Sequence, residues 1–194
     1  MTALPEQNYK ASLKNFLIPL GVILAFVWLG LLGLKARFNN STAERAKTSE
    51  VRVGSVLPLF SFATAGDGRS VSISEFSSKV VVLNFWATWC EACMEELPSL
   101  IQLRKRFQGA GLEVIGVNLD ENPDRSIEKT KQQYKIEFPL VKDVDGKLAD
   151  LFDVHAIPVT LVFDKNRKVL LIKEGGQDWF SKEIVGRVQQ WLSP

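Results

Sequence analysis

The feature that most constrains this chain is a pair of cysteines placed shortly after a long apolar run. Residues Val80–Trp86 read VVVLNFW, a continuous β-branched and aromatic stretch that is typical of a strand buried on both faces. Cys90 and Cys93 follow this run, and they are the only cysteines among the 194 residues. Apolar residues at roughly helical spacing predict a helix from Cys90 to Phe107. The cysteines are therefore expected at the amino-terminal end of a helix.

That position has chemical consequences for the two thiols. A helix amino terminus presents unpaired backbone N–H groups and the positive end of the helix dipole. Both favour a thiolate over a thiol, so we expect the pKa of Cys90 to be lowered. In such a pair the first cysteine attacks a disulfide, and Cys93, one turn inside the helix, resolves the mixed disulfide. Glu91 lies between them, and its negative charge should partly cancel the effect of the helix.

Three other uses of two neighbouring cysteines remain open. A purely structural disulfide that closes a four-residue loop contributes only about 2 kcal/mol through chain entropy, against about 4.7 kcal/mol for a 100-residue loop. Half of a metal site and a pair of buried, inert thiols are the other two. Two cysteines and one histidine are too few for a Cys₄ or Cys₂His₂ zinc site. The pattern favours a dithiol–disulfide redox pair.

Strands and helices alternate along the rest of residues 51–194, which predicts an α/β sandwich around a mixed sheet. Gly66-Asp67-Gly68 marks a hairpin between the first two strands. Asn122 is expected to cap a helix that begins with Pro123, and Pro98 is expected to kink the helix after the cysteines. The further expected strands are 59–63, 70–73, 112–119, 159–164 and 168–173, and the further expected helices are 122–134, 146–152 and 179–192.

The amino-terminal segment contains an apolar run that is long enough to cross a membrane. No residue between Lys14 and Lys35 is charged, and residues 16–34 would form a helix about 28 Å long, close to the thickness of the hydrocarbon core. A cleavable signal peptide is the alternative, but it needs a shorter run with a small-residue cleavage site close behind. We therefore expect a short tail at 1–15, an uncleaved transmembrane anchor at 16–34, a polar linker at 35–50 and one domain at 51–194.

The distribution of charge argues against a nucleic acid partner. Residues 1–38 carry four of the 24 basic residues and one of the 22 acidic residues, which leaves residues 39–194 with a net charge of −1. The domain therefore lacks the basic footprint of a nucleic-acid-binding protein. Charges beside the apolar run do not fix its orientation, because long carboxyl-terminal domains translocate despite a local bias.

Residues 81–93, VVLNFWATWCEAC, resemble the active-site segment of the thioredoxin superfamily. The likeness is greatest to the membrane-anchored TlpA/ResA/CcmG-type thiol–disulfide oxidoreductases. GSVLPLFSF at 54–62, Glu96-Leu97-Pro98 and the pair Ile157-Pro158 before a strand resemble the same group. The resemblance implies a thioredoxin fold with an amino-terminal β-hairpin extension, preceded by one transmembrane helix. One departure is Ala92, where the group usually has proline; it bears on redox potential and partner choice rather than on fold.

The resemblance also implies roles for residues around the cysteine pair. It places a cis Ile157–Pro158 peptide bond opposite the cysteines, where the backbone of Ile157 pairs with an extended substrate segment. Trp89 is expected to be partly exposed and to contact partners, whereas Trp86 packs beside the active-site turn, although either ring could simply belong to the core. Glu96, one helical turn after the second cysteine, is expected to tune the acidity of the pair.

Proton transfer is a step for which the sequence departs from cytosolic thioredoxins. Their buried aspartate is replaced here by Asn84, which cannot accept a proton from Cys93. Glu96 is the nearest acid in the sequence, and burial would raise its pKa so that it can exchange a proton with Cys93. Glu121, after the second long strand, is a further candidate, and a solvated helix residue is the plainer interpretation of Glu96.

We therefore expect a thiol–disulfide oxidoreductase at the inner (cytoplasmic) membrane, with its catalytic domain on the periplasmic side. It would reduce disulfides of specific proteins, for example in cytochrome c or oxidase maturation, and a membrane electron donor would reduce it again. No cofactor and no metal is expected. The alternatives are a copper chaperone that uses Cys90, Cys93 and His155, and a redox-inert interaction module. Peroxiredoxins have proline and Thr/Ser where this chain has Leu83 and Ala87, so their peroxide pocket is not encoded.

Overall fold

The structure is a computed structural model that describes Trp28 and residues 51–193. The expected tail, transmembrane anchor and linker lie outside the described residues, apart from Trp28, which is helical. Within the part of the chain that is described, no helix combines the length and the apolar character needed to cross a membrane. The fold presented here belongs to the unit Glu50–Pro194.

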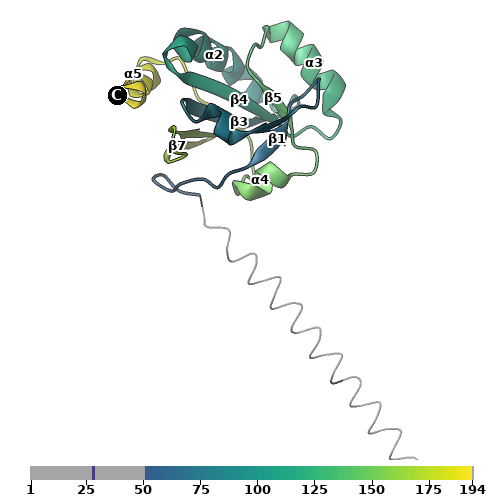
Figure 1. The fold of residues 1–194 in the computed structure, drawn as a ribbon. Coiled ribbons are helices and arrows are strands. Elements are labelled where there is room, and N and C mark those ends of the chain that lie inside the picture. Colours follow the sequence, from purple (N-terminus) through teal and green to yellow (C-terminus); the bar gives the residue numbers. More distant parts are fainter. Residues whose placement is uncertain (1–27, 29–50, 194) are drawn as a thin grey trace, which may run out of the picture. The chain divides into compact units, whose positions relative to one another are not determined.

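A five-stranded mixed sheet forms the centre of this unit (Figure 1). The strand order is β5-β4-β3-β6-β7, with β3, β4 and β5 mutually parallel and β6 and β7 antiparallel. All seven residues of β3 are buried, because this central strand has packed layers on both faces. The strands are β3 (Val80–Trp86), β4 (Leu112–Asn118), β5 (Leu140–Lys142), β6 (Val159–Phe163) and β7 (Val169–Glu174).

Three helices cover one face of the sheet: α2 (Glu91–Phe107), α3 (Pro123–Tyr134) and α5 (Lys182–Leu192) (Figure 1). Both cysteines belong to the apolar cluster beneath them. Trp86 lies across β4 in this layer, and Gly116 makes room for it. A Cβ atom at Gly116 would lie 3.0 Å from the indole Nε1 of Trp86 and 2.9 Å from Leu140 Cδ2. Close packing at this end of the sheet therefore depends on a residue without a side chain.

The opposite face is covered by the amino-terminal part of the domain and by a short helix. The hairpin of β1 (Ser61–Ala63) and β2 (Ser70–Ser72), the 3₁₀ helix η1 (Ile73–Phe76) and α4 (Lys147–Leu151) contribute to a second apolar cluster. The segment from Val56 to Thr64, which includes β1, runs under the sheet from one edge to the other. It pairs with Lys168 beside β7 through Val56, and with Val141 in β5 through Thr64. This is the expected hairpin extension.

Most of the expected elements are present, and the differences are local. The chain forms a 3₁₀ turn, η2 (Gln108–Ala110), directly after α2. β5 was not predicted, because three residues are too few to produce a periodic pattern. α2 continues through Pro98 as one helix, and a kink there stays a prediction. Asn122 does precede α3, with Pro123 in the first turn, but its side chain makes no capping hydrogen bond, contrary to our expectation.

The last helix begins later than predicted. α5 starts at Lys182 rather than at 179, because the Ser181 hydroxyl accepts a hydrogen bond from the backbone N–H of Ile184 and so caps the helix there. The preceding Trp179 is directed elsewhere, since its backbone N–H donates to Ser99 Oγ in α2 at 2.9 Å. The loop between β7 and α5 is thereby tied to the helix that carries the cysteines.

Candidate active site

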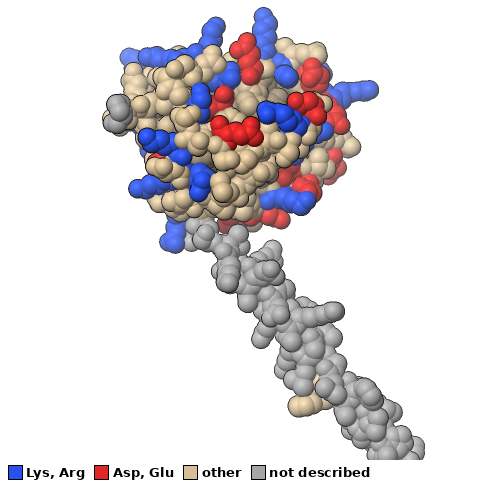
Figure 2. Space-filling model, viewed as in Figure 1, with Lys and Arg blue, Asp and Glu red and all other residues tan. Residues whose placement is uncertain are grey.

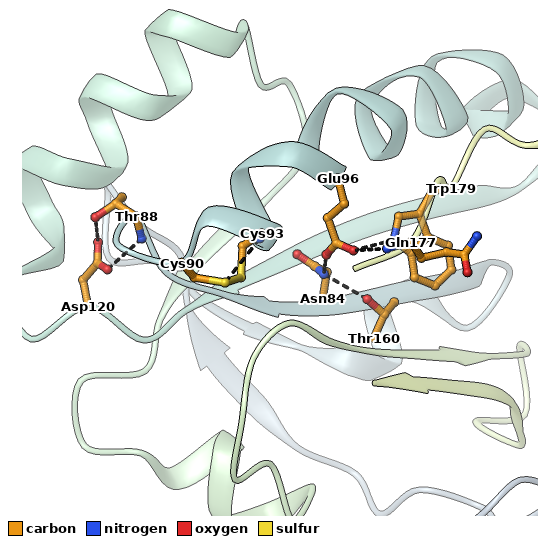
Figure 3. The surroundings of a disulfide bond; sticks show 9 residues. All are labelled: Asn84, Thr88, Cys90, Cys93, Glu96, Asp120, Thr160, Gln177 and Trp179. Atoms are coloured by element: carbon orange, nitrogen blue, oxygen red, sulfur yellow. Dashed lines mark hydrogen bonds between the residues drawn. A yellow bond between two sulfur atoms is a disulfide. The ribbon is translucent and has the colours of Figure 1, made fainter. Parts of the chain in front are cut away.

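The cysteine pair stands at the start of α2, directly after the turn that leaves β3 (Figure 3). Cys90 is the N-cap residue, and its Sγ accepts a hydrogen bond from the backbone N–H of Cys93 at 3.2 Å. The two sulfur atoms form a disulfide. Cys90 is 8% exposed and Cys93 is 2% exposed, so the first cysteine is the one nearer to solvent. The structure therefore describes the oxidised state of a pair whose first sulfur faces an N–H donor.

A buried carboxylate holds the turn that precedes Cys90. Asp120 accepts hydrogen bonds from the backbone N–H of Thr88 at 2.9 Å and from its hydroxyl at 3.0 Å. Ser126 at the start of α3 donates to the same carboxylate at 2.7 Å. Asp120 was not among the residues predicted from the sequence, although a signal was present. It follows β4, and the carboxyl ends of neighbouring parallel strands meet at one edge of a sheet. Asp120 thus ties α3 to the turn that presents the cysteines.

Glu96 lies on α2 one turn beyond Cys93, and three N–H groups surround its carboxylate (Figure 3). Asn84 Nδ2 donates to Oε1 at 2.7 Å. The backbone N–H of Gln177 and the indole N–H of Trp179 donate to Oε2 at 3.1 and 3.2 Å. Only 4% of Glu96 is exposed, so it is not a solvated helix residue.

Burial governs the acidity of this carboxyl group. Desolvation raises the pKa of Glu96 above its ordinary value, because burial makes the charged form of a carboxyl group costly. The hydrogen bonds from Asn84, Trp179 and Gln177 act in the opposite direction, as does the nearby charge of Lys173, and they moderate the rise. A carboxyl group with a raised pKa is suited to exchanging protons near neutral pH.

Asn84 has a role that the sequence did not reveal. Although it replaces the buried aspartate of cytosolic thioredoxins, its side-chain amide donates hydrogen bonds to two partners. Besides Glu96, Nδ2 donates to Thr160 Oγ1 at 2.9 Å, and Thr160 is buried in β6 two residues after Pro158. Asn84 therefore links the carboxylate on the helix to the strand that follows the Ile157–Pro158 pair.

A small cleft opens beside this carboxylate. Its volume is about 340 Å³, and it lies between the first turns of α2 and the loop that follows β7. Glu96 is part of its wall although the residue is nearly inaccessible. The other residues around the cleft are Ala92, Glu95, Ser99, Gly176, Gln177 and Asp178. The cleft gives the carboxyl group a short path to solvent.

Two of the expected substrate-binding residues, Ile157 and Pro158, line a separate cleft of about 580 Å³. The Ile157–Pro158 peptide bond is cis, as expected, and Ile157 packs against the apolar cluster that contains the cysteines. The carbonyl of Pro158 accepts a hydrogen bond from Gly175, and the adjacent Gly176 lies against Ala92, between the two cysteines. The pair is thus near the start of α2.

The two tryptophans of the motif, Trp86 and Trp89, differ clearly in their exposure to solvent. Trp86 is 2% exposed and belongs to the core, which was one of the two positions expected for it. Trp89 is 70% exposed, next to Cys90, and borders a cleft of about 470 Å³ with Glu121. An exposed aromatic ring of this size beside a reactive sulfur is available to a protein partner.

Other charged groups near the pair remain on the surface. Glu91 and Glu95 are exposed on α2, and Glu121 is exposed after β4. Acidic and basic side chains occur together on the face of the domain that Figure 2 shows. His155 is exposed and its ring is hydrogen-bonded to Asp153 at 2.9 Å. Among the described residues, no three His, Cys, Asp or Glu side chains are grouped as a metal site would require.

Comparison with known proteins agrees with this arrangement. The model of the AhpC/TSA family matches residues 53–172. The thiol-disulfide oxidoreductase ResA of Geobacillus thermodenitrificans is 33% identical over 153 residues, which are 79% of this chain and 84% of that protein. ResA of Geobacillus kaustophilus is 32% identical over 171 residues, covering 88% of this chain and 93% of that protein.

Solved structures resemble the domain as well. A protein from Chlorobium tepidum, provisionally assigned as the thiol:disulfide interchange protein DsbE, superposes with a TM-score of 0.66 at 28% identity, over 74% of this chain and 99% of that chain. A thioredoxin family protein from the same organism has a TM-score of 0.62 over 75% of this chain and all of that chain, and at 23% identity it supports the fold alone. The chain therefore belongs to the AhpC/TSA family and, within it, to the TlpA/ResA/CcmG-like group of thioredoxin-fold thiol–disulfide oxidoreductases.

Proposed function

We propose that this oxidoreductase is a membrane-anchored reductase of protein disulfides whose catalytic domain lies on the extracytoplasmic side of the inner membrane. The observation that carries the proposal is the combination of the Cys90–Cys93 disulfide at the start of α2 with the buried Glu96 one turn further on. The apolar run at 16–34 and the similarity to ResA proteins support the anchor and the compartment.

The reaction begins from the reduced pair. The thiolate of Cys90 attacks one sulfur of a substrate disulfide, and the other substrate sulfur leaves as a thiolate. The N–H of Cys93 that faces Cys90 Sγ favours the negative charge on the attacking sulfur. This step joins the protein to its substrate through a mixed disulfide.

The second step releases the substrate. Cys93 gives up its proton, attacks Cys90 Sγ and displaces the substrate sulfur, so that two electrons pass from the pair to the substrate and the Cys90–Cys93 disulfide forms. Glu96 in its ionised form accepts the proton of Cys93 and returns it to solvent through the adjacent cleft. A membrane electron donor must then supply two electrons to restore the dithiol.

We infer the substrate class from Ile157, Pro158 and Trp89. An extended segment can pair with the backbone of Ile157 beside the cis proline, and a neighbouring part of the partner can cover the exposed ring of Trp89. Such a surface accepts a flexible polypeptide that presents a disulfide. The haem-attachment cysteines of an apocytochrome c, or the cysteines of a copper-receiving oxidase subunit, are substrates of this kind.

Cysteine variants test the reaction directly. The reduced full-length chain should reduce a peptide that contains a Cys-x-x-Cys disulfide. Cys93→Ser should accumulate a mixed disulfide with the peptide, which gel electrophoresis without reductant detects, because the resolving sulfur is absent. Cys90→Ser should form no such adduct and serves as the control. An adduct of equal yield through Cys93 in the Cys90→Ser variant would contradict the assigned order of attack.

The compartment is tested separately. A full-length chain that carries Cys90→Ser, Cys93→Ser and Ser193→Cys has a single reporter thiol at its exposed carboxyl end. A membrane-impermeant maleimide should label this thiol in intact cells whose outer membrane has been made permeable. The same chain without Ser193→Cys is the control. Labelling that occurs only after lysis would place the domain in the cytoplasm.

A further inference from the structure

The loop between β7 and α5 contacts α2 at three points around Glu96. Trp179 is 1% exposed, and its indole Nε1 donates to Glu96 Oε2 at 3.2 Å. Its backbone N–H donates to Ser99 Oγ, and the backbone N–H of Gln177 donates to Glu96 Oε2 at 3.1 Å. Ser99 Oγ in turn donates to the backbone carbonyl of Glu96 at 2.7 Å. The loop is therefore fastened to the side chain and to the backbone of the same residue.

These donors determine where a proton can bind. A carboxylate offers about four acceptor positions, two on each oxygen. Oε2 receives both the Trp179 and the Gln177 hydrogen bonds, and Oε1 receives that of Asn84. No further donor among the described residues takes the fourth position, which is on Oε1. The loop thus occupies one oxygen of Glu96 and leaves the other to receive a proton.

We propose that Trp179 is a positioning residue for thiol–disulfide exchange: its indole N–H fixes Oε2 of Glu96 and thereby couples the loop between β7 and α5 to proton transfer at the cysteine pair. The inference rests on the proposed role of Glu96. It goes beyond that role, because it adds to the effect of burial a contact, made by a residue 83 positions away in the chain, that favours the ionised carboxylate. Loss of an N–H donor to a carboxylate favours its protonated form.

The charged groups near Glu96 belong to β7, to α2 itself and to the loop before α5, whereas β3 contributes the neutral Asn84. Lys173 in β7 favours the ionised form. Glu95 on α2 and Asp178 on the loop lie around the adjacent cleft. Cys93 precedes Glu96 by one turn on the same helix and does not titrate while the disulfide is formed. Measurement in the oxidised protein therefore separates the titration of Glu96 from that of the thiols.

The first measurement uses the unaltered indole as a reporter. In the oxidised, full-length, ¹⁵N-labelled protein, the Nε1–H resonance of Trp179 should move with pH and report a midpoint above 4.5, the ordinary value for a glutamate. The resonance is assigned by its loss in Trp179→Phe. In Glu96→Gln the same resonance should remain but no longer titrate with this midpoint. A Trp179 resonance that titrates equally in both proteins overturns the inference.

The second measurement follows the reaction. Trp179→Phe keeps an aromatic ring in the core but removes the N–H donor, so the acid limb of the substrate-release rate should move upward by about one pH unit. In a Glu96→Gln background, Trp179→Phe should cause no further movement. A shift of equal size in both backgrounds overturns the inference, because Trp179 would then act through packing alone.

The outcomes also separate this inference from the proposed function. If Glu96→Gln changes the pH profile and Trp179→Phe does not, the positioning role of Trp179 is wrong and the role of Glu96 stands. If Glu96→Gln leaves the profile unchanged, the role of Glu96 and the inference built on it are both wrong. Ser99→Ala removes the acceptor for the Trp179 backbone and offers a milder disturbance of the same loop if Trp179→Phe does not fold.

Discussion

Two buried carboxylates flank the disulfide, and they are bound in different ways. Asp120 is 5% exposed, and its hydrogen bonds come from the turn before Cys90 and from the start of α3. Glu96 is 4% exposed, and its hydrogen bonds come from β3 and from the loop before α5. Figure 3 places them on opposite sides of the disulfide. Similar burial therefore accompanies two different sets of partners.

The different partners indicate different roles: Asp120 positions other parts of the chain, whereas Glu96 is itself positioned by them. Two of the three donated hydrogen bonds come from Thr88 in the turn that presents the cysteines and the third comes from Ser126 in α3, so the carboxylate holds that turn against α3. The donors to Glu96 belong to the sheet and to a distant loop, so they fix the carboxylate. Each carboxylate borders a cleft, Glu96 the one beside Gln177 and Asp120 the one beside Trp89, so the contrast rests on the hydrogen-bond donors. From this we expect that removing Asp120 disturbs structure, whereas removing the charge of Glu96 disturbs proton transfer.

The largest effect is expected at Glu96. Glu96→Gln should slow the release of substrate from Cys90 by at least about tenfold, since a proton-accepting side chain of this kind is typically worth about 10²–10⁴-fold in rate. It should also lower the apparent pKa of the cysteine pair, because a carboxylate that opposes a thiolate is lost. Single-turnover exchange measured across the pH range of the thiols reports both quantities.

The matched control is Glu95→Gln, which removes an exposed carboxylate from the same turn of α2 and should change little. Equal single-turnover rates for wild type, Glu95→Gln and Glu96→Gln across this range would contradict the assignment of the proton to Glu96. Glu121 or water would then be the acceptor to test next.

At Asp120 we expect the larger loss of stability. Asp120→Ala leaves the backbone N–H of Thr88 without its acceptor, and a buried polar group without a partner costs about 1–3 kcal/mol. The midpoint of urea unfolding should fall accordingly, with the slope of the transition unchanged. The pH profile of substrate release should keep its shape. A changed profile with undiminished stability would reverse the roles that we assign to Asp120 and Glu96.

Glu96 should also be recognisable in the pH dependence of stability. Burial raises the pKa of Glu96 in the folded state above its ordinary value of 4.5, so the folded protein binds this proton more tightly than the unfolded chain does. The resulting stabilisation is fully present below pH 4.5 and is lost as the pH rises through the raised pKa. Glu96→Gln should remove this component, which the difference between urea midpoints of the oxidised proteins at acidic and neutral pH measures.

The smallest effect is expected at His155, which lies apart from both carboxylates. His155→Ala should leave the rate of disulfide reduction nearly unchanged, because the exposed ring is hydrogen-bonded only to Asp153 among the described residues. The reduced wild-type protein should retain no stoichiometric copper against a competing chelator. Tight copper binding that disappears in His155→Ala would favour the copper chaperone.

The region around the cysteines was the part of the fold most accessible to sequence reasoning. The run VVVLNFW forms β3 with the bounds that were predicted, and α2 follows the turn as expected. The sequence patterns that predict β3 and α2 are local. A central strand must be apolar on both faces, and a helix must repeat its apolar residues every three to four positions. The short β5 and the delayed start of α5 lack such a signal, because packing against other elements decides them.

The partners of the buried carboxylates were not accessible in this way. The proximity of Glu96 to the cysteines was expected from its spacing after Cys93 and from the family resemblance, and its burial was left open. Its donors are 12, 81 and 83 residues distant in the chain. The link between Asp120 and Thr88 spans 32 residues. No periodic pattern encodes such contacts, because each depends on the side chains that the completed sheet and helices bring to one place.

The sequence by itself determined the chemistry available to this protein: a redox pair of cysteines at a helix start, an acid one turn beyond them, and an Ile-Pro pair before a strand. These follow from residue type and short spacing, which local geometry translates directly into structure. Only the tertiary structure decided how the acid works. Burial raises the pKa of Glu96, and donors from β3 and from the loop before α5 restrain it, because desolvation and hydrogen bonding exist only once distant segments are packed together.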